Sequence, residues 1–131
     1  MRITRNTVPT VTQPKSNFTG LVYADRVAEP IGPSQVHANA VYFTPGSRTN
    51  WHTHPNGQTI YVVEGVGVCQ RRGGPVEVIR PGDRVFFEPG QEHWHGAHPK
   101  ASCEMIDRLS CCPPGKGGSS MRAYSLDLRQ R

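Results

Sequence analysis

Two histidines separated by one residue, followed by a turn and a strongly β-forming run, constrain this chain more than any other feature. In an extended strand, residues i and i+2 share a face, so His52 and His54 should point to the same side. A turn signal follows at residues 55–57, and the chain then returns through Gln58 into the β-branched and aromatic run Thr59–Val63. The sequence therefore predicts that the carboxamide oxygen of Gln58 approaches both imidazoles from the next strand.

A third histidine, His93, lies beyond several further β-forming runs. Three imidazoles and one amide oxygen are a ligand set that suits a divalent first-row metal ion. One histidine alone would more often have a structural role, but four donors in this arrangement favour a metal site. We therefore predict that His52, His54, Gln58 and His93 bind a divalent metal. The alternative interpretation is a metal-free domain in which these side chains only line a pocket.

The spacing of these residues resembles the two sequence motifs of the cupin family. The first motif, Gly-x5-His-x-His-x3-(Glu or Gln)-x6-Gly, is matched by Gly46, His52, His54, Gln58 and Gly65. The second motif, Gly-x5-Pro-x-Gly-x2-His-x3-Asn, is matched by Gly82, Gly90 and His93, while Glu88 and Ala97 occupy its proline and asparagine positions. Both motifs together are specific for the cupin fold and a metal, but they indicate no particular reaction, because this fold hosts many chemistries.

Within this family, the chain resembles the small manganese-dependent cupins that act as hydroxynitrile lyases. The similar stretches are Phe18–Gly20, Trp51–Pro55, Gly57–Thr59, Pro81–Asp83 and His93–Ala97. The resemblance implies a lyase that cleaves or forms cyanohydrins, with manganese as the metal, although Fe, Zn, Ni or Co would also suit the ligands. It further implies a homo-oligomer, either a dimer or a tetramer.

Short β-forming runs separated by glycine and proline fill residues 18–108. The full chain of 131 residues contains 14 glycines and 12 prolines, and turn signals recur at close spacing. This pattern predicts a single all-β domain, either a sandwich or a closed barrel, and the resemblance selects the double-stranded β-barrel of jelly-roll type. We expect residues 1–17 to form an N-terminal arm. Residues 109–131 should be a divergent, disordered tail, because they are too poor in apolar residues to fold.

Charge and hydrophobicity exclude several kinds of partner. The net charge of +5 divides into +2 for residues 1–108 and +3 for residues 109–131, so the predicted domain is nearly balanced and a poor candidate for binding nucleic acid. The N-terminus has no apolar signal segment, and no run approaches ~18 apolar residues. We therefore expect a cytoplasmic protein without a membrane partner and with a small-molecule substrate. In that compartment its four cysteines should be free thiols, with Cys69 in the core.

Two features of the predicted site concern chemistry. Gln58 is neutral where many cupins have a carboxylate, so the metal should keep more positive charge and act as a stronger Lewis acid. His95 lies two residues beyond His93 and should face the same interior, where a neutral imidazole is a candidate general base. The alternative is that His95 only hydrogen-bonds a metal ligand.

Asn39, Val41 and Phe43 share a strand face and are predicted to line the substrate pocket, although the last two are also typical core residues.

One departure from the lyases puts catalysis in question. Those enzymes carry a further histidine and a glutamine after the second motif, where an ungapped count finds Met105 and Leu109. Neither side chain can transfer a proton. A shifted reading frame near residue 103 and a drift to another function both explain this difference. The alternatives to a lyase are therefore an iron-dependent dioxygenase of small organic substrates and a non-catalytic cupin that binds a small molecule or a metal.

Overall fold

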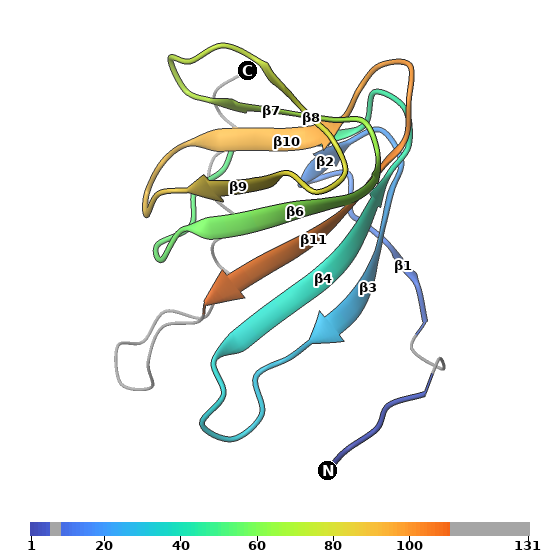
Figure 1. Cartoon of the computed structure of the whole chain (residues 1–131), viewed down its shortest axis with the longest axis vertical. Helices are drawn as coiled ribbons and strands as arrows, with labels where there is room; N and C mark the ends of the chain where they lie inside the picture. The colour runs from blue at the N-terminus through green and yellow to red at the C-terminus, as the bar shows by residue number, and fades with distance from the viewer. Residues whose placement is uncertain (6–8, 111–131) are drawn as a thin grey trace.

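The computed structural model describes residues 1–5 and 9–110, which form two antiparallel β-sheets (Figure 1). The strand order is β1-β3-β4-β11-β6-β9 in the six-stranded sheet and β2-β5-β10-β7-β8 in the five-stranded sheet. The strands are β1 (Val11–Thr12), β2 (Phe18–Thr19), β3 (Val22–Ala28), β4 (Val36–Phe43), β5 (Arg48–Thr49), β6 (Gln58–Gly65), β7 (Gly67–Arg71), β8 (Glu77–Ile79), β9 (Arg84–Phe87), β10 (His93–Ala97) and β11 (Cys103–Ser110). The described part of the chain contains no helix, so the all-β prediction is confirmed.

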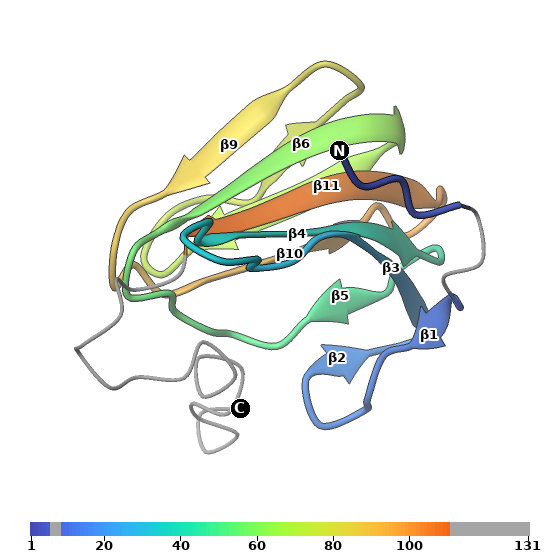
Figure 2. The same cartoon turned by 90° about the horizontal axis from the view of Figure 1, so that it is seen from below.

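The apolar core lies between the two sheets, which Figure 2 shows as separate layers, with β6, β11 and β4 in one and β5 in the other. The register of β11 determines which of its residues face the core. Met105 lies opposite Val41 of β4 and Val62 of β6, and opposed residues in antiparallel strands share a face. The core cluster contains Val22, Val41, Phe43, Ile60, Val62, Cys69, Ile79, Phe87, Ala97, Cys103 and Met105. Cys69 is therefore a free, buried core thiol, as the sequence predicted.

The segment that carries the first two histidines is less regular than the predicted strand. Regular pairing in β5 ends at Thr49, and the chain meets β10 again at an isolated bridge between His52 and His93. There the backbone N–H of each histidine donates to the carbonyl of the other, over 2.9 and 3.0 Å. This bridge holds two predicted metal ligands, which lie far apart in the sequence, next to one another.

Both ends of the predicted barrel differ from the expected boundaries of 18 and 108. The predicted arm supplies β1, which pairs with β3, and β11 continues through Leu109 to Ser110. The rest of the predicted tail, residues 111–131 with Cys111 and Cys112, lies outside the described residues. In the part of the chain that is described, no helix is long and apolar enough to cross a bilayer.

Gly65, which ends the first motif, should be among the least replaceable residues of the barrel. Its φ is +82°, and a Cβ there would overlap the carbonyl oxygen of Ser102. Gly73 has a similar φ of +78° but open space around it, which makes Gly73→Ala a matched control. The backbone conformation should cost about 1–2 kcal/mol in both variants. Overlap should add roughly 1–3 kcal/mol in Gly65→Ala alone. Urea unfolding measures both losses, and equal losses would contradict this explanation.

Candidate metal centre

Four buried side chains from three segments converge between the sheets. His52 and His54 come from the loop after β5, Gln58 begins β6 and His93 begins β10. The ring centroid of His52 lies 4.9 Å from that of His54 and 4.4 Å from that of His93. The four side chains are between 0% and 9% exposed. The structure therefore brings together all four residues that the sequence proposed as metal ligands.

The amide oxygen of Gln58 faces the imidazoles. Its Oε1 lies 2.6 Å from Nε2 of His93 and 3.4 Å from Nε2 of His52. The amide nitrogen of Gln58 points the other way and donates to Oδ1 of Asp107 over 2.7 Å. One oxygen thus approaches the group of rings. The sequence predicted its approach to His52 and His54, and its shortest contact is with His93.

Backbone carbonyls determine which ring nitrogen carries the proton in two of the histidines. Nδ1 of His52 lies 2.8 Å from the carbonyl oxygen of Asn50, and Nδ1 of His93 lies 2.8 Å from that of Gln91. A carbonyl only accepts hydrogen bonds, so both Nδ1 atoms must donate. In the neutral rings, the lone pair is therefore on Nε2, the nitrogen that points toward Gln58. A hydrogen bond of this kind also orients the imidazoles that bind metals in proteins.

This arrangement places lone pairs against one another in a buried site. Burial, and then the neighbouring His52, lower the pKa of His93 to about 3, so its ring is neutral near pH 7. Burial likewise lowers the pKa of His54 to about 3, with a smaller contribution from His52. Nε2 of neutral His93 and Oε1 of Gln58 are then two acceptors facing each other without a proton between them. A bound cation removes that repulsion, so the donor set fits a divalent metal ion.

His95, the predicted base, lies beside this cluster on β10. It is 2% exposed, and the ring of Phe43 packs edge-on against it at a centroid distance of 5.7 Å. Neither ring nitrogen of His95 has a hydrogen-bond partner among the described residues. Burial, and then the three neighbouring histidines, lower its pKa well below the usual value, so the ring is neutral. A buried imidazole without a hydrogen-bond partner among the described residues is available to bind a metal ion, a water molecule or a substrate.

The histidines also offer a second donor set. The ligating atoms of His52, His93 and His95 all lie within 4.8 Å of one another, which is close enough to hold one metal ion. This trio contains His95, which was predicted to transfer a proton. It omits His54 and Gln58, which were predicted to bind the metal. Two of the three imidazoles are common to both sets, so a site for a metal ion is supported whichever set binds it.

Asp107 was not among the residues predicted from the sequence. This carboxylate lies on β11, is 5% exposed and accepts the hydrogen bond from Gln58. Burial raises its pKa to about 6, although the bond from Gln58 acts in the opposite direction. The signal was in the alternation of the last strand, where Met105 and Asp107 share a face. A charged residue on an inward face is unusual, and it indicates a position with a role beyond packing.

The predicted pocket residues lie on the inner face of β4. Val41 and Phe43 belong to the core cluster, in agreement with the structural interpretation of both residues. Asn39 is half-buried and lies opposite Asp107 in the register of β4 and β11. Of the two positions where the lyases carry histidine and glutamine, Met105 is fully buried in the core, and Leu109 pairs through its backbone with Gln58.

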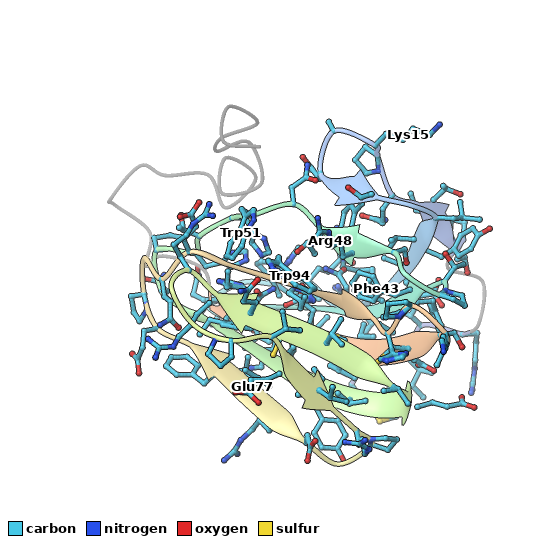
Figure 3. The ribbon with its side chains drawn as sticks, turned by 90° about the horizontal axis from the view of Figure 1, so that it is seen from above. Lys15, Phe43, Arg48, Trp51, Glu77 and Trp94 are labelled. Carbon is cyan, nitrogen blue, oxygen red and sulfur yellow. The ribbon has the colours of Figure 1, made fainter. Side chains whose placement is uncertain are left out.

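The outer side of the same segments is held by stacked aromatic and cationic groups (Figure 3). Trp51 and Trp94 meet edge to face at a centroid distance of 6.4 Å. The guanidinium of Arg72 lies 3.9 Å from the Trp51 ring and that of Arg48 lies 4.9 Å from the Trp94 ring. Trp51 and Trp94 adjoin His52 and His93 in the sequence and occupy the opposite face. The stack therefore fixes from outside the two segments that present histidines inside.

Comparison with known proteins gives two matches by sequence. The family model described as Cupin domain matches residues 39–108. An (R)-mandelonitrile lyase from Granulicella tundricola is 52% identical over 86 residues, which is 66% of this chain and 66% of that enzyme. The matched segment thus spans just under two thirds of that relative's length.

Solved structures give the same architecture. A cupin-like protein from Thermotoga maritima is 35% identical, with a TM-score of 0.73, over 76% of this chain and 75% of that chain. The polyketide cyclase RemF from Streptomyces resistomycificus has a TM-score of 0.68 at 23% identity, over 87% of this chain and 81% of that chain. The second similarity concerns the fold alone.

Proposed function

We propose that this chain, which belongs to the cupin domain family, is a metal-dependent lyase that cleaves or forms the carbon–carbon bond of cyanohydrins. The observation that carries the proposal is the His95 imidazole, which has no hydrogen-bond partner in the described part of the chain and lies beside a cluster of neutral metal donors. The identity of 52% to an (R)-mandelonitrile lyase supports the same reaction class. The match covers part of that enzyme, so the activity is a proposal for this chain.

In this proposal, His52, His54, Gln58 and His93 hold the metal ion. Manganese is the metal implied by resemblance to the lyases, and imidazole and amide ligands suit it. The ion would supply Lewis acidity where the substrate hydroxyl loses its proton and negative charge develops on oxygen. Gln58 contributes its oxygen because its nitrogen is already engaged by Asp107.

His95 is the proposed base. Its neutral ring has a lone pair on one nitrogen, and no group of the described chain competes for that lone pair. His95 accepts the hydroxyl proton of the cyanohydrin, the carbonyl double bond forms and the carbon–carbon electron pair leaves with cyanide. The proton then passes from His95 to cyanide, which leaves as hydrogen cyanide beside the aldehyde. In the direction of synthesis, His95 takes the proton from hydrogen cyanide and then gives it to the oxygen of the new cyanohydrin.

The apolar surroundings of His95 assist this transfer. Phe43 packs against its ring, and the ring of Phe87 stacks at a centroid distance of 6.3 Å. These side chains exclude water, which strengthens electrostatic interactions in the site. Met105 cannot carry a proton, so His95 would have to act without the additional histidine of the lyases that this chain resembles.

An anaerobic assay with racemic mandelonitrile tests the proposal. Protein loaded with Mn(II) is expected to release cyanide and benzaldehyde faster than buffer does, and chelator-treated protein should lose this activity until Mn(II) is restored. Oxygen uptake with Fe(II), without anaerobic cyanide release, would instead identify a dioxygenase. The absence of both activities in a protein that still binds metal would contradict the lyase and leave a binding function.

A further inference from the structure

Asp107 is a buried carboxylate that the proposed reaction does not use directly. It lies on β11 between the strands that carry Gln58 and Asn39, and it is 5% exposed. Its hydrogen-bond partner within residues 1–5 and 9–110 is the amide nitrogen of Gln58, at 2.7 Å. Burying a carboxylate with one hydrogen-bond partner among the described residues costs free energy of folding. That cost favours a functional role for the contact with Gln58.

We propose that Asp107 is a positioning residue of the metal centre, which holds the Gln58 amide with its oxygen toward the imidazoles and its nitrogen away from them. The inference rests on the metal centre of the proposed function. It adds a residue that acts on the metal through a ligand rather than by direct contact.

The need for such a residue follows from the shape of an amide. The oxygen and the nitrogen of the Gln58 side chain are nearly the same size, and the amide can rotate to exchange them. Without a metal, the lone pairs on Nε2 of His52 and His93 would attract the amide N–H groups. That flipped orientation satisfies the histidines but presents a donor where a metal requires an oxygen.

Asp107 opposes the flip because an ionised carboxylate only accepts hydrogen bonds. An N–H to carboxylate bond is charge-assisted and is roughly twice as strong as the neutral bond that an imidazole nitrogen offers. The amide nitrogen therefore stays with Asp107, and the oxygen remains toward His93 in the absence of a metal. The carboxylate also draws positive charge to the N–H side, which leaves the oxygen more negative and a better ligand.

This contact revises the prediction made for Gln58 from the sequence. A neutral amide was expected to leave the metal with more positive charge than a carboxylate ligand would. Because Asp107 accepts a hydrogen bond from the amide nitrogen, it makes the amide oxygen more negative. The metal should therefore keep less positive charge than a neutral amide alone would leave it. The Gln58 side chain itself is neutral, but Gln58 and the Asp107 carboxylate together carry one negative charge.

Calorimetric titration with Mn(II) tests the inference. Asp107→Leu keeps the branching at Cγ in a larger side chain and removes the acceptor, so the affinity should fall roughly 10- to 100-fold, as is typical when the partner of a metal ligand is lost. Asp107→Asn should lose less, because its side chain can still accept while also permitting the flipped amide. Glu104→Gln is the matched control: it removes one carboxylate three positions earlier on β11, on the opposite face, and should leave the affinity unchanged.

A mutant cycle separates a positioning role from a general structural one. If Asp107 acts through Gln58, then Asp107→Leu should cause no further loss of Mn(II) affinity in the Gln58→Ala background. An equal loss in both backgrounds, or no loss in either, would overturn the inference while leaving the metal centre intact. Failure of the unaltered protein to bind Mn(II) would overturn the metal centre and the inference together.

A second readout needs neither metal nor activity. In the ¹⁵N–¹H spectrum of the metal-free protein, the side-chain amide signal of Gln58 is identified by its loss in Gln58→Ala. Its proton shift should report the hydrogen bond to the carboxylate and should move upfield in Asp107→Asn, a substitution with little change in shape. An unchanged shift would contradict the proposed contact, even if Asp107→Leu failed to fold.

Discussion

Replacing His93 by alanine is expected to abolish stoichiometric metal binding and to leave a folded barrel. The change removes a donor that both ligand sets share. The loss of affinity should therefore exceed the roughly 10- to 100-fold loss that follows removal of a second-layer partner. The barrel should survive, because its core consists of apolar side chains from both sheets rather than of the ion.

Metal analysis after loading and desalting, together with circular dichroism, measures both expectations for His93→Ala. The matched control is His98→Ala, which removes a half-buried histidine whose Nδ1 accepts a bond from the backbone of Lys100, outside the cluster. That variant should retain one equivalent of metal. Stoichiometric metal in folded His93→Ala would show that the ion binds elsewhere.

His95→Ala and His54→Ala should differ in metal retention, which makes this pair the sharpest test of the two donor sets. In the proposed function, His95 moves a proton and His54 binds the ion. His95→Ala should therefore keep the metal and lose roughly 10²- to 10⁴-fold in cyanide release, the usual contribution of a positioned general base. His54→Ala should lose metal and activity together.

The measurements are metal stoichiometry and turnover on the same preparations of both variants. If His95→Ala loses the ion and His54→Ala retains it, then the metal is held by His52, His93 and His95, and the assignment of His95 as the base is wrong. Retention of full turnover by metal-loaded His95→Ala would also contradict its role in proton transfer.

The sequence predicted the inward-facing donors because their geometry depends on local rules. Alternation along β10 places His93 and His95 on one face and Trp94 on the other, and the turn at residues 55–57 returns Gln58 toward His52. These relations hold over a few residues, so neither requires knowledge of which strands pair. The all-β class followed in the same way, from short runs between glycines and prolines.

Features set by contacts between distant segments were not predicted. The irregular path after Thr49 depends on the bridge between His52 and His93, and the pairing of β1 with β3 depends on the register of the sheet. The role of Asp107 depends on the pairing of β11 with β6, which brings it to Gln58 across 49 positions of sequence. Periodicity indicates which face a residue occupies but not which side chain lies opposite.

The position of the ion in crystals of the Mn(II)-loaded protein tests the central claim most directly, through an anomalous difference map at the manganese absorption edge. The account predicts a single peak whose protein ligands are the Nε2 atoms of His52 and His93, His54 and Oε1 of Gln58, with His95 outside the coordination sphere and Asp107 bonded to the amide nitrogen of Gln58. An ion bound by His95 in place of His54 and Gln58, or a Gln58 amide turned with its nitrogen toward the ion, would contradict it.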